Sequence, residues 1–250
     1  MFTDDPITDT FRVYQRKRGH RYSVDDVVTA YQAVHAKPNA MTYADIGCGI
    51  GSVLLMVAYK LERTNILGVE AQDASYELVV KNVGRNGLTD RVELVHGDLR
   101  DLVYEARFHK HFDLVTGTPP YFPPGHATPS PDPQRRYARI EYRGGVEAYV
   151  KSAEFLMRDD GRAVICGSYS AQKRMQDACA AHALFIEERL DIFAKEANSE
   201  PLFNVFTLRR STPDDSQTKV TRYISRTPDG RKSEQALNVR ACFGLFDNPY

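Results

Sequence analysis

Short apolar runs alternate with longer amphipathic segments from residue 41 onward. Five of the runs are too short for helices and are predicted to be strands. They cover residues 41–46, 65–69, 91–95, 112–116 and 161–167. Between them, apolar residues recur every three or four positions, which predicts helices over 53–61, 76–83 and 146–156. This alternation is typical of a mostly parallel sheet covered by helices on both faces.

The end of the chain departs from that alternation. After a predicted helix at 171–182, residues 184–194 and 201–210 form two strand-like runs joined by a short link, which predicts an antiparallel pair. Residues 211–250 form a polar tail. We therefore expect one α/β domain over residues 1–250: a Rossmann-like, seven-stranded, mostly parallel sheet with an antiparallel last strand and helices on both faces.

Composition narrows the class of protein only slightly. Basic and acidic side chains number 33 each, so overall charge gives no support for nucleic-acid binding and does not exclude a local basic face. The four cysteines form no C-x-x-C pair, which fits a reduced, cytoplasmic compartment, and the histidine spacing indicates no metal site. The first thirty residues carry five aspartates and no apolar block, so we expect neither a signal peptide nor a membrane span.

A glycine loop follows the first predicted strand. Asp45 ends that strand, and Gly47, Gly49 and Gly51 precede a helix, so that a ligand could lie against bare main chain at the helix N-terminus. The spacing G-x-G-x-G differs from the dinucleotide fingerprint G-x-G-x-x-G, which makes NAD binding the weaker interpretation. A helix-capping turn without a ligand is the other alternative.

Two further acids close the next strands. Glu70 lies 23 residues after Gly47, where a carboxylate can accept hydrogen bonds from ribose hydroxyls. Asp98 follows the third strand, where it could face an adenine amino group while Leu99 packs against the ring. The alternative is that these are two surface acids. The ordered set of acids and glycines at strand ends favours a nucleoside cofactor site.

The quoted motifs "DIGCGIG" (45–51), "GVE" (68–70) and "GDL" (97–99) resemble, in the same order, those of class I S-adenosylmethionine-dependent methyltransferases. The resemblance implies that S-adenosylmethionine is the cofactor. It also implies that Asp45 contacts the amino end of the methionine part, Glu70 binds the ribose and Asp98 recognises the adenine. Four further positions are assigned to the cofactor site on the same ground: Arg21, Cys48, Ala71 and Thr118.

The stretch "TPPY" (118–121) follows the fourth predicted strand. It resembles the N/D-P-P-Y/F/W motif of amino-methyltransferases, which implies catalytic roles for Thr118, Pro119, Pro120 and Tyr121 opposite the glycine loop. In that motif a side-chain oxygen and a proline carbonyl accept hydrogen bonds from the amine, and the aromatic ring stacks on the flat acceptor. Thr118 departs from the motif, because it offers one acceptor oxygen on a shorter, branched side chain. A tight loop with a buried tyrosine is the alternative.

The flanking sequence narrows the resemblance to one branch. Residues 11–31 and the stretch "AR-x-E" (138–141) resemble the bacterial tRNA(Val) adenine-N6 methyltransferases. In 11–31 the matching positions are Gln15, Gly19, Arg21, Ser23, Asp25 and Ala30. The resemblance implies methylation of an adenine amino group in tRNA or another structured RNA. Five residues are assigned to substrate contact: Tyr121, Phe122, Arg135, Arg136 and Arg139.

Three segments receive roles on this interpretation. Residues 1–40 are expected to cap the site, and 118–145 to form a mobile substrate loop, with no helical or strand pattern in 123–136. A cluster of cations in 12–21 is either a phosphate-contacting arm or a solvated segment. Its members are Arg12, Arg16, Lys17, Arg18 and Arg21.

No histidine or lysine is expected to act as a base near the corner, because the proton can leave to water after transfer. The alternatives to RNA methylation are a small-molecule or protein-side-chain methyltransferase and a catalytically weak protein that binds RNA or a partner.

Overall fold

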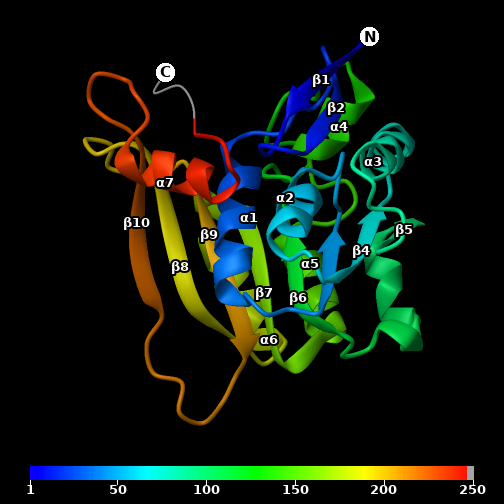
Figure 1. Ribbon diagram of the computed structural model, residues 1–250. Coiled ribbons are helices and arrows are strands. Elements are labelled where there is room, and N and C mark those ends of the chain that lie inside the picture. The colour runs from blue at the N-terminus through cyan, green and yellow to red at the C-terminus, as the bar shows by residue number, and fades with distance from the viewer. Residues whose placement is uncertain (247–250) are drawn as a thin grey trace.

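A computed structural model describes residues 1–246 of the chain. Its central feature is an eight-stranded sheet with the strand order β10-β8-β9-β7-β6-β3-β4-β5 (Figure 1). The strands are β3 (Thr42–Ile46), β4 (Asn65–Glu70), β5 (Val92–His96), β6 (Phe112–Gly117), β7 (Met157–Ser168), β8 (Leu184–Lys195), β9 (Phe203–Arg210) and β10 (Lys219–Arg226).

Strand directions confirm the predicted α/β class. β3 to β7 run parallel to one another, and β9 is antiparallel to both β7 and β8. β3 lies between β4 and β6, so the chain reverses its strand order beside β3. In such sheets ligands bind at the carboxyl ends of the strands next to this reversal.

The eighth strand is a departure from the expected seven. β10 pairs in parallel with β8, and α7 (Glu234–Cys242) follows it, so residues expected to form a polar tail belong to the folded domain. β10 is an edge strand in which only Tyr223 is buried. It therefore lacks the alternation of apolar and polar residues by which a strand is recognised in sequence. The last four residues of the predicted tail, 247–250, lie outside the described residues.

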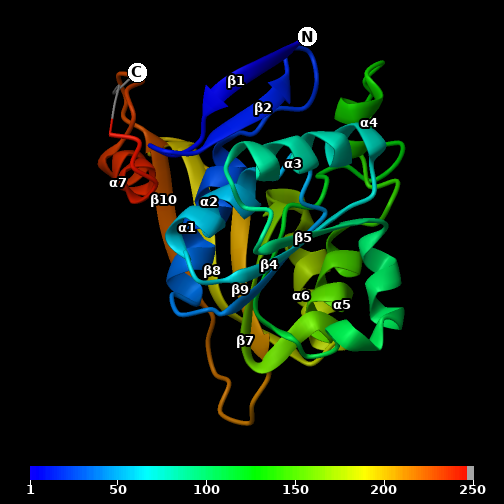
Figure 2. The same ribbon diagram turned by 45° about the vertical axis from the view of Figure 1, so that its right-hand side comes forward.

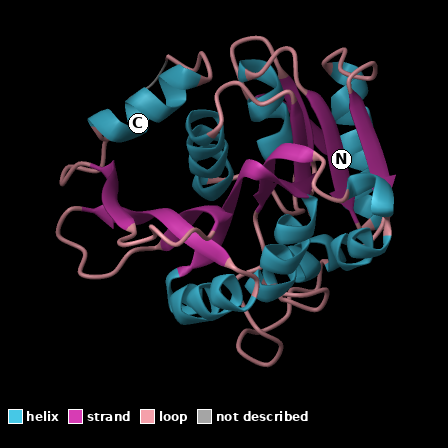
Figure 3. Ribbon diagram, turned by 90° about the horizontal axis from the view of Figure 1, so that it is seen from below, coloured by secondary structure: helices cyan, strands magenta, loops and turns pink. Residues whose placement is uncertain are grey.

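Helices cover both faces of the sheet (Figures 1 and 3). One face carries α1 (Val24–Ala36), α2 (Ser52–Lys60), α3 (Asp73–Arg85) and α7, whose apolar residues form one buried cluster. The other face carries α5 (Val146–Leu156), α6 (Gln172–Ala181) and the 3₁₀ turns η1 (Leu99–Tyr104) and η2 (Ala106–Phe108), and a third turn, η3 (Tyr169–Ala171), precedes α6. None of the helices within residues 1–246 has the length and apolar character needed to cross a membrane.

A hairpin from the N-terminal segment lies over one end of the sheet (Figure 2). Its strands are β1 (Phe2–Pro6) and β2 (Arg12–Arg16). Two asparagines of the α3 region hold it: Asn82 Oδ1 accepts a hydrogen bond from the Tyr14 amide at 2.7 Å, and Asn86 Oδ1 accepts one from the Arg12 amide at 2.8 Å. The hairpin is therefore fixed to the body of the domain.

The segment 118–145 contains a short helix that the sequence pattern did not predict. α4 (Pro133–Arg139) begins after Asp132, whose side chain accepts a hydrogen bond from the Arg135 amide at 3.0 Å. Proline at the first position of a helix needs no hydrogen-bond donor and has a suitable φ. The proline-rich composition concealed this helix start, because clustered prolines are more typical of irregular structure.

Candidate functional site

The glycine loop between β3 and α2 adopts the left-handed backbone that its glycines permit. At Gly47 φ is +67°, and a Cβ atom there would lie 2.2 Å from the Tyr149 hydroxyl oxygen. Tyr149 is a buried residue of α5. Both the backbone conformation and the close approach of this side chain therefore require glycine at position 47. Gly51, with φ of +85°, is the N-cap of α2.

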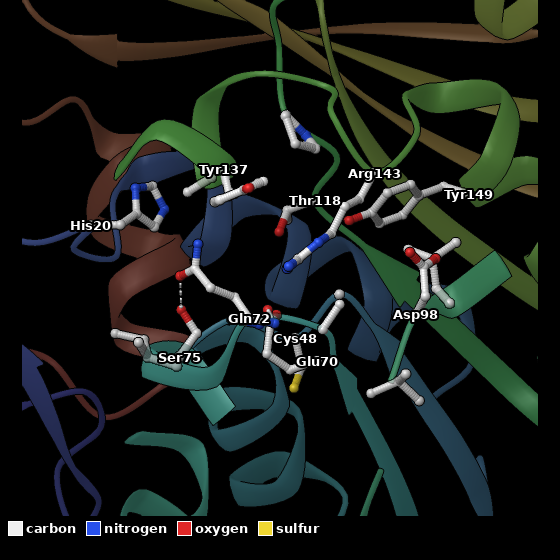
Figure 4. Close-up of a pocket in the computed structure, with 18 of the residues that line it drawn as sticks. His20, Cys48, Glu70, Gln72, Ser75, Asp98, Thr118, Tyr137, Arg143 and Tyr149 are labelled. Atoms are coloured by element: carbon white, nitrogen blue, oxygen red, sulfur yellow. Dashed lines mark hydrogen bonds between the residues drawn. The ribbon is translucent and has the colours of Figure 1, made fainter. Parts of the chain in front are cut away.

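A cavity opens above this loop, and we call it the loop cavity (Figure 4). Many of its walls come from the ends of β3, β4 and β5. Eight residues assigned to the site from sequence line it: Gly47, Cys48, Gly49, Glu70, Ala71, Asp98, Leu99 and Thr118. Pro120 lines it as well. One cavity thus brings together strand ends that lie up to about 70 residues apart in sequence.

Glu70 and Asp98 lie in this cavity in different electrostatic settings. Glu70 accepts hydrogen bonds from the Gly49 amide at 2.8 Å and the Gln72 amide at 2.7 Å, while burial raises its pKa. Burial would also raise the pKa of Asp98, but hydrogen bonds from Arg100 outweigh it and lower that pKa. Asp98 therefore stays ionised, and both carboxylates retain lone pairs for a polar ligand.

Asp45 lies beneath the loop and is only 2% exposed. Its Oδ1 accepts a hydrogen bond from the Thr116 hydroxyl at 2.7 Å, and its Oδ2 has no partner among the described residues. Burial raises its pKa to about 7. An unpaired buried carboxylate oxygen is costly, and a cationic ligand group nearby would relieve that cost. The glycine loop, this oxygen and the two acids above it therefore fit S-adenosylmethionine, which carries a cationic amino-acid end and a nucleoside.

A second cavity adjoins the first, and we call it the corner cavity. Its walls include Thr118, Pro119, Tyr121 and Phe122 of the corner, with Arg135 and Arg139 of α4. Thr118 lines both cavities. The corner therefore lies at the boundary between them, as a motif that presents an acceptor to a cofactor must.

Tyr121 is held by hydrogen bonds to its hydroxyl group. The hydroxyl donates to Asp25 Oδ2 at 3.0 Å and lies 2.9 Å from the Cys166 sulfur. The ring stacks on Phe203 with 6.5 Å between ring centroids. The hydroxyl contacts and the Phe203 ring therefore fix the orientation of the Tyr121 ring, and Tyr121 also lines the corner cavity.

Four of the assigned residues do not line the cavity to which the assignment would put them. Asp45 and Gly51 line neither of the two cavities, and the other two are Arg21 and Arg136. Arg21 lines the corner cavity rather than the loop cavity, and its guanidinium is 3.1 Å from the Asp5 carboxylate. Arg136 lines neither of these two cavities, and its Nε donates to the Ser130 carbonyl at 2.9 Å.

The cations in residues 12–21 are largely paired within the chain. Arg12 lies 2.9 Å from Asp4, and Arg16 lies 2.8 Å from Asp132. Lys17 and Arg18 are exposed at the end of the hairpin. Ion pairs with aspartates therefore favour a solvated segment over a phosphate-contacting arm for most of residues 12–21. Lys17 and Arg18 remain exposed.

Several residues that line the loop cavity were missed from sequence. They are His20, Tyr22, Asp26, Ile50, Ser52, Val69, Gln72, Ser75, Gly97, Tyr137, Ala138, Arg143, Gly144 and Tyr149. Asp26 had a sequence signal, because Ser23 and Asp26 form a capping box at the start of α1. Burial, reinforced by Asp25, raises the pKa of Asp26 to about 8.

His20 is a histidine near the corner that the sequence interpretation did not consider. His20 lines both the loop cavity and the corner cavity. No periodicity or spacing in the sequence marks it, because it lies in an irregular turn between β2 and α1. Within residues 1–246 no group of His, Cys, Asp and Glu side chains could hold a metal ion.

Comparison with known proteins adds independent evidence. A family model described as "Methyltransferase domain" matches residues 44–129, which include the glycine loop, Glu70, Asp98 and the corner. A tRNA1(Val) (adenine(37)-N6)-methyltransferase from Flavobacteriaceae bacterium (strain 3519-10) is 25% identical over 95% of this chain and 96% of its own. A protein of the same name from Bacteroides thetaiotaomicron is 28% identical over 74% of this chain and 75% of its own.

Solved structures share the fold. A predicted O-methyltransferase from Agrobacterium tumefaciens has a TM-score of 0.64 at 15% identity, covering 91% of this chain and 100% of that one. Pyrococcus horikoshii TYW2 in complex with MeSAdo has a TM-score of 0.59 at 14% identity, covering 83% of this chain and 70% of that one. The family model and the near full-length relatives agree with the ordered motifs that the chain carries an S-adenosylmethionine-dependent methyltransferase domain, and the solved structures show that its fold is shared.

Proposed function

We propose that the protein transfers the methyl group of S-adenosylmethionine to the N6 amino group of an adenine in tRNA. The observation that carries the proposal is the position of Thr118 on the shared boundary of the loop and corner cavities. A residue at this boundary can touch an acceptor nitrogen while that nitrogen faces the cofactor. Pro119 and Tyr121 line the corner cavity beside it.

The chemistry of an aromatic amine explains these residue types. Its lone pair is delocalised into the ring, so acceptors for its N–H groups are needed to favour a pyramidal nitrogen and stabilise the developing charge. The Thr118 hydroxyl and the Pro119 carbonyl are the acceptors that the corner supplies. The Tyr121 ring, fixed through its hydroxyl, offers a surface on which an extruded base can stack.

The loop cavity would hold the cofactor with its methionine end near Asp45 and its adenosine near Glu70 and Asp98. S-adenosylmethionine supplies a methyl carbon activated by its bond to a sulfonium. Asp45 would pair with the amino group through its unpartnered Oδ2, which is buried and has no protein partner among the described residues. Glu70 would turn lone pairs to the ribose hydroxyls while keeping its amide hydrogen bonds to the loop.

RNA is the favoured acceptor class for two reasons. Arg135 and Arg139 are exposed at the corner cavity, and the Arg139 guanidinium lies 5.5 Å from the centre of the Phe122 ring, an arrangement suited to a phosphate beside a stacked base. The relatives that match most of the chain are named as tRNA adenine-N6 methyltransferases. A tRNA substrate would place the enzyme in the cytoplasm.

The test is transfer of labelled methyl from the cofactor to separated fractions of total tRNA, protein and small metabolites. Label in tRNA that digests to N6-methyladenosine supports the proposal. Label confined to metabolites or protein would replace RNA with another acceptor. Cofactor binding without any transfer would indicate a binding protein.

A matched variant, Thr118→Asn, restores the usual acceptor of the motif. We expect this variant to transfer methyl to adenine at least as fast as the wild type. Complete loss of transfer would show that Thr118 is adapted to a different acceptor.

A further inference from the structure

His20 lies where the two cavities meet, although it comes from a turn distant in sequence from the corner. It lines both the loop cavity and the corner cavity, and Figure 4 shows its side chain at the rim of the loop cavity. Across residues 1–246, no protein group makes a hydrogen bond to its imidazole ring. A ring that borders both cavities with both nitrogens unused is available to a bound substrate.

The backbone that carries His20 is clamped in place. The Gln134 side chain is 1% exposed, and its Oε1 accepts a hydrogen bond from the His20 amide at 3.3 Å. Its Nε2 donates to the Ser75 hydroxyl at 3.2 Å, which ties α4 to α3. Gly19 leaves room for this clamp, since a Cβ there would lie 2.1 Å from Gln134 Oε1. The turn is therefore positioned by long-range contacts.

The surroundings favour the neutral form of the ring. Burial lowers the pKa of His20, Asp25 raises it by a smaller amount, and Arg135 and Arg139 lower it further. The charged groups around the ring come from β2, α1, α4 and the loop cavity: Arg16, Asp25, Asp26, Arg135, Arg139, Glu70 and Arg143. At neutral pH one ring nitrogen is thus an acceptor.

We propose that His20 supplies a further acceptor beside the Thr118 hydroxyl: it accepts a hydrogen bond from the substrate amine and takes its proton after methyl transfer. In the transfer, the nitrogen lone pair forms the new N–C bond, the electron pair of the carbon–sulfur bond returns to sulfur, and the nitrogen becomes cationic. His20 then receives the excess proton, becomes an imidazolium and releases the proton to water. This inference rests on the proposed function, because it requires an amino group as acceptor.

A double-mutant cycle between His20 and Thr118 tests it. We expect His20→Ala to lower kcat for methylation of tRNA roughly 10- to 100-fold. In the Thr118→Asn background, where the longer side chain provides the amide oxygen that the motif usually has, the same change should cost less than about 3-fold. His111→Ala, at the opposite end of β6, removes an exposed histidine as a control and should leave kcat within about 2-fold of the wild type.

Two readouts separate catalysis from packing. The imidazole of His20 in the free enzyme, followed by NMR during a pH titration, should show a pKa below its ordinary value, and kcat/KM of the wild type should fall on the acid side at that same pKa. His20→Ala should lack this acid limb while keeping the melting temperature and the affinity for S-adenosylhomocysteine close to those of the wild type.

The outcomes are distinct. A wild-type protein that labels no adenine overturns the proposed function and this inference together. Adenine labelling that is equally fast in His20→Ala overturns the inference alone. An equal loss in the wild-type and Thr118→Asn backgrounds, or an unchanged acid limb, also overturns it, because the histidine would then act through packing.

Discussion

The loop cavity and the corner cavity share Thr118 and His20, but they differ in how much of their lining lies next to a sequence motif. The loop cavity is lined in part by residues that follow β3, β4 and β5, each next to its own motif, and in part by residues from 20–26, 118–120 and 137–149. The corner cavity is assembled from three segments, 19–26, 118–122 and 135–139, whose contacts cross the fold. The loop cavity therefore has a core of residues next to recognisable motifs, whereas the corner cavity depends throughout on how distant segments are held together.

The buried acids and the histidine of this region have pKa values shifted in opposite directions. Around the loop cavity, burial raises the pKa values of Asp26, Asp45 and Glu70, so the ligand-free protein holds acids that a cationic ligand would stabilise. Burial lowers the pKa of His20, which lines both cavities. Positive charge on a ligand would stabilise the ionised form of these acids, and a neutral His20 could accept a proton, as the two proposals require.

The largest loss of cofactor affinity is expected from a substitution at Gly47, where bare main chain borders the loop cavity. Gly47→Ala combines a strained φ of +67° with a contact of 2.2 Å to the Tyr149 hydroxyl, and should weaken S-adenosylmethionine binding by roughly 100-fold or more in calorimetry. Gly49→Ala, with φ of +59° and no heavy atom within 4 Å, isolates the strain and should cost about 10-fold.

A double variant separates the two causes at Gly47. Removing the Tyr149 hydroxyl in Gly47→Ala/Tyr149→Phe should recover part of the lost affinity. No recovery would show that backbone strain alone explains the loss.

The next effect concerns the charge beneath the loop. Asp45→Asn should lower cofactor affinity roughly 10- to 100-fold, since the buried carboxylate would no longer pair with the amino group. Binding to the wild type should also release protons near pH 6.5, because a cation lowers the pKa of Asp45 from about 7. Calorimetry in buffers of different ionisation enthalpy measures this release. Equal proton release in the variant would contradict the assignment.

The same group predicts a pH dependence of stability. The pKa of Asp45 in the folded protein is about 7, above the 3.8 of the unfolded chain, so its contribution is fully present below pH 3.8 and is lost as pH rises through 7. The melting temperature of the cofactor-free wild type should therefore fall relative to Asp45→Asn across this range.

The sequence predicted those parts of the molecule that lie next to strands with a clear apolar pattern, and it missed those that depend on distant contacts. Asp45, Glu70 and Asp98 were found because each ends or follows a strand with a strong apolar pattern, and the seven strands from β3 to β9 were predicted for that reason. β10 and α4 were not, since an exposed edge strand and a proline-capped short helix carry little periodicity.

His20 shows why the rest of the site was beyond sequence reasoning. Its place depends on the clamp from Gln134, more than a hundred residues away, and on the paired hairpin before it. No local pattern reports such a contact. Arg21 shows the converse, because a motif match placed it at the cofactor while its own neighbourhood provides an acidic partner in Asp5.

An intermediate effect is expected at this clamp. Gln134→Ala removes a buried side chain with hydrogen bonds to the His20 amide and to Ser75, and should lower the free energy of unfolding by about 1–3 kcal/mol. Release of the turn should reduce kcat/KM for tRNA roughly 5- to 10-fold, with a smaller change in cofactor affinity. Gln176→Ala, at an exposed position of α6, is the matched control. Equal losses of cofactor affinity and tRNA methylation would contradict this prediction, because Gln134 would then hold the loop cavity in place as well as the His20 turn.

The smallest effect is expected at Arg21, where the motif assignment and the geometry disagree. Its side chain is 40% exposed, and its guanidinium is occupied by Asp5 at 3.1 Å and the Thr3 hydroxyl at 2.9 Å. Exposed ion pairs of this kind contribute at most about 1 kcal/mol, so Arg21→Ala should leave the melting temperature nearly unchanged. Cofactor affinity, measured by calorimetry, should stay within about 2-fold of the wild type, because the residue does not line the loop cavity. A 10-fold loss of cofactor affinity would contradict this prediction. It would show that Arg21 leaves Asp5 when the cofactor binds, so that the N-terminal hairpin takes part in cofactor binding.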